Sequence, residues 1–464
     1  MTANTKNNFK ILIVVEEGKH FIYYKSVAEE LLCRGYNVSM FFAKRSEEEC
    51  ILLPITQFKQ RYQKFEFGKA FSPVSFLNTV LVKRRFATYR HLLLPRERPR
   101  FFSDRVIIYL PFFLRFAARH NLFYINSFIK SGIFGKWLGY VEEKIPPEKK
   151  IIAQLRSVGP DVLLAATGDL SSTSPESNYL KAAKVLGIPC ALSVMSWDNL
   201  QTKGAIQIIP DVLLVWNEMQ VEEATKYHQV PRDIIRITGA FFFDQWFLTH
   251  KPSRREEFCT RYGLDPGKPI LTYLSSSGIF GDEIEYLRKI YKAIEGLDIQ
   301  LVVRPYPVNG KKLYNKRRHK FYNSPESAGV TLIPGRGSLP NTEDAAQLFY
   351  DTIYHSFAYI GIGNTGMIDG LLIGRPGITL IDEYYNDIQS KSPHFKHLIS
   401  SGALNITKDV GGLRNIIKDL QTSKDGLESK RREFIGQYLR PRGIQISAAK
   451  CLADELEKVT GNRK

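Results

Sequence analysis

Short apolar runs alternate with segments of helical period along most of the chain. Runs at 11–15 and 38–42 flank a segment in which apolar residues recur at helical spacing until Gly35. A wholly apolar run of this length is typical of a strand buried in a parallel sheet. The pattern therefore predicts a strand, helix, strand unit, which is how a doubly wound α/β domain begins.

The same alternation continues in two further series. Strands are expected at 162–166, 190–194, 212–216 and 234–238, and a second cycle of strands at 270–274, 300–303, 331–333, 359–361 and 377–381. Residues 44 to about 150 do not follow the pattern and are expected to form a helical insertion. The sequence predicts two doubly wound Rossmann-like domains, 1–245 and 246–444, and a C-terminal helix within 445–464 that crosses back to the first domain.

Composition is that of a globular protein, with 44% hydrophobic and 24% charged residues among 464. Five scattered cysteines lack zinc-ligand spacing and are expected to be thiols in a reducing compartment. No run approaches the length of a membrane-spanning helix, and the first residues lack the apolar core of a secretion signal. We therefore expect a cytoplasmic protein.

The net charge of +18 is unevenly distributed. Residues 83–130 hold eleven Lys or Arg against two acids, with aromatic residues between them. This basic segment favours contact with an anionic membrane surface, because no nucleic-acid-binding motif accompanies it and no nucleic acid is expected as a partner. A cleft for a polyanionic ligand and a solvated face remain alternatives.

A glycine-rich turn lies between the apolar strand 359–361 and the helix that follows. Gly361, Gly363 and Gly366 allow the backbone to approach an anion, and the free amides at the start of the helix point toward it. The spacing fits neither the phosphate loop of nucleoside triphosphatases nor the dinucleotide fingerprint. A phosphate-bearing ligand is predicted, with an ordinary tight turn as the alternative.

Three segments carry a resemblance to a known superfamily: 237–244 (ITGAFFFD), 303–307 (VRPYP), and 363–370 (GNTGMIDG) with 374–376 (GRP). Together with the two-domain pattern they resemble the GT-B glycosyltransferases. Within that superfamily the segments are most similar to CDP-glycerol glycerophosphotransferases and related surface-polysaccharide transferases, and more weakly to UDP-N-acetylglucosamine 2-epimerases. Tyr306 departs from the histidine often found there. The resemblance implies two domains facing a cleft and a nucleotide-activated donor.

Transfer from a nucleotide donor requires positive groups and helix amides around the leaving diphosphate. Arg304 is the first candidate for this contact, with a surface role beside a turn as its alternative. Asp369 resembles the family carboxylate that binds ribose hydroxyls, and a solvated acid is the rival interpretation. The remaining expected donor-binding residues are Ser276, Ser277, Gly278, Gly363, Asn364, Thr365, Gly366 and Asp382.

An inverting transfer needs a base for the acceptor hydroxyl. His20 leads, with Asp169 and Glu17 as further candidates, because all three follow predicted strand ends. The acceptor is expected to contact Trp197, Asp198, Asn199 and Lys203. The alternative is a capped loop in which Asp198 or Asn199 starts a helix. No metal pair is seen, and no cofactor is expected beyond the nucleotide sugar used as substrate.

The sequence thus predicts a metal-independent glycosyltransferase that moves a sugar or polyol phosphate from a nucleotide donor. The expected acceptor is a surface glycan or a lipid-linked precursor at the inner membrane face. Two alternatives stay open: an isomerase similar to UDP-sugar 2-epimerases, and a non-catalytic GT-B-like protein that binds glycan or lipid.

Overall fold

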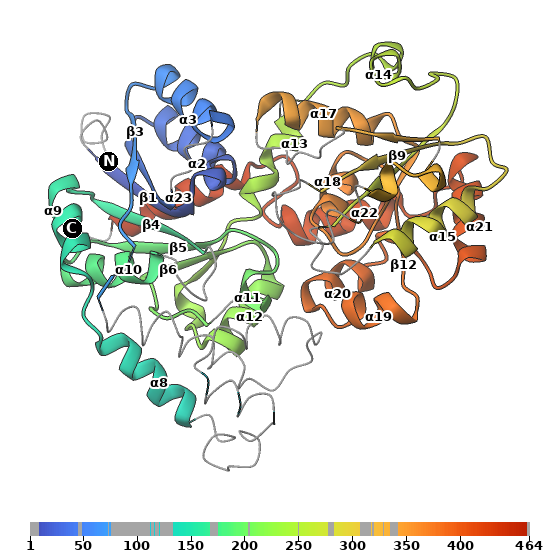
Figure 1. Cartoon of the computed structure of the whole chain (residues 1–464). Coiled ribbons are helices and arrows are strands. Elements are labelled where there is room, and N and C mark those ends of the chain that lie inside the picture. Colours follow the sequence, from blue (N-terminus) through green and yellow to red (C-terminus); the bar gives the residue numbers. More distant parts are fainter. Residues whose placement is uncertain are drawn as a thin grey trace. The chain divides into compact units, whose positions relative to one another are not determined.

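The chain forms two compact units, described separately below. Unit 1 contains Met1–Asp244 and Gly436–Lys464, and unit 2 contains Gln245–Ile435 (Figure 1). The computed structural model describes residues 9–44, 49–72, 74–75, 112, 116, 120, 133–167, 175–202, 205–248, 250–276, 283–306, 317, 320–327, 329–334 and 342–461.

Unit 1 is built on a seven-stranded parallel sheet with the order β3-β2-β1-β4-β5-β6-β7. β1 supplies side chains to both faces, because successive residues of a strand point to opposite sides. The strands are β1 Lys10–Glu17, β2 Asn37–Lys44, β3 Phe65–Lys69, β4 Val162–Thr167, β5 Cys190–Val194, β6 Val212–Val215 and β7 Ile235–Ile237.

Helices cover both faces of this sheet. Ile11 and Ile13 of β1 lie in a core with α2 (Phe21–Cys33), α3 (Glu49–Arg61) and α23 (Ala448–Gly461). Leu12 and Val14 lie in a second core, on the opposite face, with α9 (Lys149–Val158), α10 (Glu176–Val185) and α12 (Glu218–His228). The other described helices of unit 1 are η1 Gly18–His20, α8 Ile133–Lys144, α11 Asn199–Thr202, η4 Arg232–Ile234, η5 Phe241–Phe243 and η7 Ile435–Leu439, and α13 Asp244–Leu248 leads into unit 2.

Unit 2 repeats the architecture with a six-stranded parallel sheet of order β10-β9-β8-β11-β12-β13. Its strands are β8 Ile270–Leu274, β9 Gln300–Arg304, β10 Val330–Leu332, β11 Ala358–Gly361, β12 Gly377–Leu380 and β13 Leu404–Thr407. Its helices are α14 Arg255–Tyr262, α15 Ile284–Ile294, η6 Pro325–Ser327, α17 Glu343–Tyr354, α18 Gly366–Leu372, α19 Glu383–Ser390, α20 Pro393–Ser400, α21 Val410–Gln421 and α22 Glu428–Phe434.

Each sheet has one point at which the strand order reverses. In unit 1 this switch point lies between β1 and β4, and in unit 2 between β8 and β11. Connections leave these neighbouring strands in opposite directions, so a crevice opens beyond their carboxyl ends, where doubly wound proteins bind ligands. In this fold, the residues expected to bind ligands are those that follow β1 and β4 in unit 1 and those that follow β8 and β11 in unit 2.

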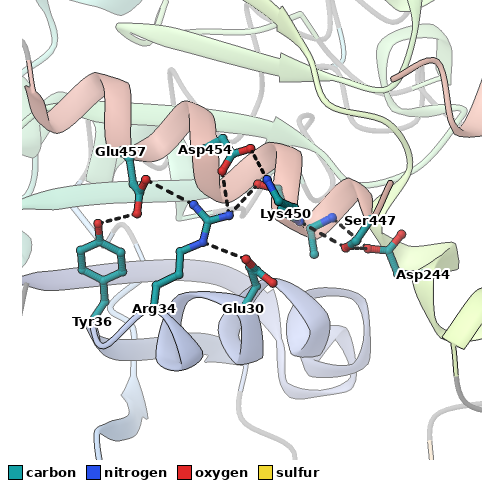
Figure 2. A network of polar contacts seen from close by, with 9 residues as sticks. Glu30, Arg34, Tyr36, Asp244, Ser447, Lys450, Asp454 and Glu457 are labelled. Atoms are coloured by element: carbon teal, nitrogen blue, oxygen red, sulfur yellow. Dashed lines mark hydrogen bonds and ion pairs between the residues drawn. The ribbon is translucent and has the colours of Figure 1, made fainter. Parts of the chain in front are cut away.

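The last helix, α23, packs on α2 within unit 1 through its apolar face, which includes Leu452 and Leu456. Arg34 of α2 forms ion pairs with Asp454 at 2.7 Å and Glu457 at 3.3 Å, as Figure 2 shows. At the start of the helix Asp244 accepts hydrogen bonds from the hydroxyl of Ser447 and the amides of residues 448 and 449. The predicted return of the C-terminal helix to the first half of the chain is confirmed.

The carboxylate of Asp244 is also paired with a buried arginine. Arg440 Nη2 lies 2.7 Å from Asp244 Oδ1, and both side chains are almost wholly buried. Burial raises the pKa of Asp244 and lowers that of Arg440. The pair therefore fixes the first turn of α23 at the point where the chain leaves unit 1.

The α/β fold with two doubly wound sheets is confirmed, but two edge strands differ from the sequence prediction. β3 lies in the segment predicted to be a helical insertion, and β13 was not predicted at all. Edge strands are buried less completely than central ones, so they lack the continuous apolar run that marks the others. Among the helices that the structure describes, none is long and apolar enough to cross a membrane.

Candidate functional site

The glycine-rich turn of unit 2 lies at its switch point. Gly363 has a φ of 53°, a left-handed conformation that favours glycine. Asn364 Nδ2 donates to the backbone oxygen of Leu274 at 2.9 Å, which ties the turn to the end of β8. A Cβ on Gly366 would lie 3.1 Å from Asn364 Oδ1, so the turn is tightly wound. The predicted phosphate-binding turn thus occupies the edge of the sheet where a ligand is expected.

One group of this turn has no hydrogen-bond partner among the described residues, and another does not cap the helix that follows. Asn364 Oδ1 is buried and accepts no hydrogen bond there. Thr365, which precedes α18, makes no side-chain capping bond to the helix. The first amides of a helix have no partner within the helix itself. The amides of Met367 and Ile368 already donate to the backbone oxygens of Asn364 and Thr365. The turn therefore offers a ligand one side-chain acceptor and the amides of Thr365 and Gly366.

Arg304 ends β9 and is 5% exposed. Its Nη1 donates to Thr352 Oγ1 at 3.0 Å, and its guanidinium lies 4.8 Å from the centroid of the Phe349 ring. Nη2 is buried without a hydrogen-bond partner in the described part of the chain. Burial lowers the pKa of Arg304 to about 9. The structure thus holds a buried cation that an anionic ligand would stabilise.

Phe349 of α17 connects this cation with the glycine turn. The Phe349 ring faces the Arg304 guanidinium, and a Cβ on Gly366 would lie 3.8 Å from Phe349 Cζ. Arg304 and Gly366 are thus close to the same aromatic side chain. Two of the predicted donor residues, one at the end of β9 and one at the start of α18, both lie beside Phe349 in unit 2.

Ser276, after β8, is engaged by a carboxylate. Its amide donates to Glu283 Oε1 at 2.7 Å, its hydroxyl donates to the same oxygen, and both residues are fully buried. A phosphate would have to compete with Glu283 for these two donors. Ser277 and Gly278, the other predicted residues of this loop, lie outside the described residues.

The two predicted carboxylates of unit 2 have partners within the fold. Asp369 is buried in α18 and accepts a hydrogen bond from Trp246 Nε1 at 2.6 Å. Burial raises the pKa of Asp369 to about 7. Asp382 begins α19, accepts from the amide of Tyr385 at 2.9 Å, and forms an ion pair with Lys289. Each carboxylate therefore has a structural role, and its predicted contact with the donor stays a prediction.

In unit 1, two of the three candidate bases lie at the switch point. Glu17 ends β1 and forms an ion pair with Lys19 at 2.5 Å. His20 ends η1, and its ring centroid lies 5.7 Å from that of Tyr23. Asp169 lies outside the described residues. The structure places Glu17 and His20 together at the edge where an α/β sheet binds ligands.

The loop after β5 contains the predicted acceptor-binding residues. Ser196 donates its amide to Asn199 Oδ1 and its hydroxyl to Asp198 Oδ1, each at 2.7 Å. Asn199 then begins the short helix α11, which is the alternative interpretation of this loop. Trp197 is 3% exposed, so its ring is not presented to solvent. Lys203 lies outside the described residues.

Comparison with known proteins places the fold but no family. No protein-family model matches the chain, and no curated protein matches its sequence. Solved structures do match. A glycosyltransferase from Rickettsia africae is similar over 99% of this chain and 100% of its own, with 10% identity and a TM-score of 0.56. The chain has a GT-B-like fold.

Epimerases share this GT-B-like fold. A UDP-N-acetylglucosamine 2-epimerase from Neisseria meningitidis, solved with UDP-N-acetylglucosamine, is similar over 97% of this chain and 100% of its own, with 13% identity and a TM-score of 0.53. The corresponding enzyme from Methanocaldococcus jannaschii is similar over 97% of this chain and 99% of its own, with 11% identity and a TM-score of 0.55. The closer similarity to CDP-glycerol glycerophosphotransferases stays a prediction.

Several side chains that shape the candidate site of this GT-B-like protein were not predicted. Glu283 binds the Ser276 loop, Trp246 binds Asp369, and Phe349 contacts Arg304. Their partners are distant in sequence or lie across a loop, and no short motif marks them. Among the described residues, no group of three or more His, Cys, Asp and Glu side chains is arranged to hold a metal ion.

Proposed function

We propose that this protein is a glycosyltransferase whose unit 2 binds a nucleotide-activated donor. The observation that carries the proposal is the buried guanidinium of Arg304, which has no carboxylate partner in the described part of the chain and packs on the Phe349 ring. That ring also lies beside Gly366 of the glycine turn. A diphosphate supplies the negative charge that this cation lacks. The GT-B-like fold, shared with a solved glycosyltransferase, supports the proposal.

In this proposal the amides of Thr365 and Gly366 bind the donor diphosphate together with Arg304. Negative charge grows on the leaving diphosphate during transfer, so cations and amides aimed at it lower the barrier. Glu17 and His20 remain the candidates for the base that accepts the proton of the acceptor hydroxyl. The acceptor is proposed to be a surface glycan or its lipid-linked precursor.

Calorimetry with UDP, CDP, GDP and their sugars tests the donor site directly. One class of nucleotide should bind, and Arg304→Ala should weaken its affinity at least about tenfold, as expected for loss of a charged hydrogen bond. Asp369→Ala tests the predicted ribose contact separately. Lys268→Ala, an exposed cation of the same unit paired with Asp298, is the matched control and should leave affinity unchanged. Undiminished binding by Arg304→Ala would place the donor elsewhere.

The alternative function is that of a sugar-nucleotide 2-epimerase, which the matches to solved epimerases favour. Product analysis separates the two. A transferase releases nucleoside diphosphate in proportion to glycosylated acceptor, whereas an epimerase converts one intact nucleotide sugar into its isomer. Incubation with UDP-N-acetylglucosamine in the absence of acceptor, followed by chromatography of the nucleotide sugars, distinguishes isomer formation from transfer.

A further inference from the structure

The helix α8 of unit 1 carries an exposed apolar stripe. Ile133, Trp137 and Tyr140 are spaced four and three residues apart, so they lie on one side of the helix. Their exposed fractions are 55%, 54% and 59%. Lys144 continues the stripe, and its Nζ lies 5.2 Å from the centroid of the Tyr140 ring. Three large apolar side chains thus share one water-exposed face.

The C-terminal end of α8 is fixed to unit 1. Lys181 of α10 is buried and donates to the backbone oxygens of Glu142 at 2.5 Å and Ile145 at 3.0 Å. Glu142 and Ile145 are themselves buried. In Figure 1, α8 extends from this anchored end away from the helices that cover the sheet. The stripe is therefore held on a firmly attached helix and is not a loose segment.

The exposed charges on and around α8 are mostly positive, although the helix itself holds two lysines and two acids, of which Glu142 is buried and Glu143 is exposed. Lys136 lies within the helix and Lys144 ends it. Lys144 and Lys184 also line a cavity of about 440 Å³ at this end, together with Glu143. In the sequence, 83–130 directly precedes this region with eleven basic residues against two acids. An anionic partner with an apolar interior matches both the charge and the stripe.

We propose that α8 docks unit 1 on an anionic lipid bilayer, with Ile133, Trp137 and Tyr140 inserted at the level of the headgroups. Tryptophan and tyrosine favour this interface, because their rings are apolar and carry a polar group that can stay hydrated. Lysine side chains beside the stripe contact acidic headgroups, each adding to the attraction at low salt. Because α8 is only twelve residues long, it lies in the plane of the interface and does not span it.

Tryptophan fluorescence tests the geometry directly. The protein has four tryptophans, and the other three, Trp197, Trp216 and Trp246, are 3%, 1% and 7% exposed. A change in a water-exposed tryptophan therefore reports on Trp137. Addition of vesicles of phosphatidylglycerol and phosphatidylcholine to the full chain should shift the emission to shorter wavelength, and brominated lipids should quench it. Pure phosphatidylcholine vesicles should have a much smaller effect.

Variants separate insertion from charge attraction alone. Trp137→Phe should abolish the spectral change yet keep vesicle cosedimentation, whereas Trp137→Gln should weaken cosedimentation about tenfold, as expected when one large apolar side chain no longer inserts. Leu53→Gln is the matched control, since Leu53 is 49% exposed on α3, outside the stripe. Melting temperatures of all variants should match that of the wild type.

Three results would overturn the proposal. Cosedimentation without any emission shift would mean that the basic residues bind lipid without insertion of the stripe. Equal binding by Trp137→Gln and the wild type would exclude α8 from the contact. Self-association in the absence of lipid that Trp137→Gln abolishes would assign the stripe to a second copy of the chain.

Discussion

Replacing Arg304 with methionine should make the protein more stable and its nucleotide binding weaker. Methionine keeps most of the side-chain length and the contact with Phe349 but removes the buried charge. Burial lowers the pKa of Arg304 to about 9, several units below the ordinary arginine value. Each pKa unit corresponds to about 1.4 kcal/mol, so burial of the charged guanidinium costs on the order of 4 kcal/mol when no ligand is bound.

Part of this cost is offset by the hydrogen bond to Thr352 Oγ1, which the variant loses. Replacement of buried ionic groups by apolar ones is often neutral or stabilising by about 1–4 kcal/mol. We therefore expect Arg304→Met to raise the free energy of unfolding by about 1–3 kcal/mol. The same change should lower the affinity for nucleoside diphosphate at least about tenfold, because a charge-assisted contact is lost.

Thermal unfolding with and without nucleoside diphosphate measures both effects in one series. The wild type should be stabilised by the nucleotide, while Arg304→Met should melt at higher temperature alone and respond less to it. Arg255→Met is the control. Arg255 donates to the backbone oxygens of Pro266, Lys268 and His355 at 2.8, 2.7 and 2.6 Å, so its loss should destabilise unit 2 without changing affinity.

A loss of stability in Arg304→Met as large as that in Arg255→Met, with unchanged nucleotide affinity, would refute a role of Arg304 in binding the donor. Arg304 would then be a structural arginine whose hydrogen bond to Thr352 outweighs the cost of its burial. The donor site would have to be sought away from the β9 end.

Two further changes test carboxylates of the fold. Burial raises the pKa of Asp369 to about 7, so the folded state keeps a proton that the unfolded chain releases near pH 4. The free energy of unfolding should therefore fall as the pH rises from about 4 to about 7. Asp369→Asn should remove this loss, and urea midpoints at about pH 5 and pH 8 check it; equal pH dependence of variant and wild type would contradict the assignment. Asp244→Ala should cost about 3–5 kcal/mol because it leaves Arg440 buried without its carboxylate, and Asp244→Ala with Arg440→Met should recover much of that loss. Urea unfolding measures both variants, and a cost for Asp244→Ala below about 1 kcal/mol would mean that the pair does not hold α23.

The central strands were predictable, whereas two of the four edge strands, β3 and β13, were not. The other two edge strands, β7 and β10, were predicted close to their observed bounds. β5 and β8 are buried at every position, so each is a mostly apolar run, interrupted only by Ser193 and Thr272. β3 and β13 lie at the edges of their sheets and contain exposed or half-exposed positions, which leave a short mixed pattern. A strand that is buried on both faces can be recognised from its run of apolar residues. A partly exposed edge strand lacks that run, and it forms because it pairs with a neighbouring strand that is distant in sequence.

The positions of the candidate residues along the strands were predictable, but their partners were not. Arg304 is the last residue of β9 and Asn364 follows β11, close to the strand ends that the sequence pattern predicts. The pairing of Trp246 with Asp369 joins residues 123 apart, and only the tertiary fold brings them together. The engagement of Ser276 by Glu283 depends on the path of the loop between them. Residue type and spacing predict which positions at strand ends can bind a ligand. Tertiary packing decides which of their side chains already form hydrogen bonds within the fold.

The order of segments along the chain also has a consequence for biosynthesis. All of unit 2, Gln245–Ile435, is one uninterrupted stretch, whereas unit 1 requires α23 from the very end of the chain. On the ribosome, unit 2 has its full sequence available before unit 1 does. The nascent first half must wait with the α2 face of its core uncovered until α23 has been synthesised. A fragment of residues 245–435 is therefore the natural choice for separate expression, and a truncation before α23 exposes apolar surface to aggregation or chaperone binding.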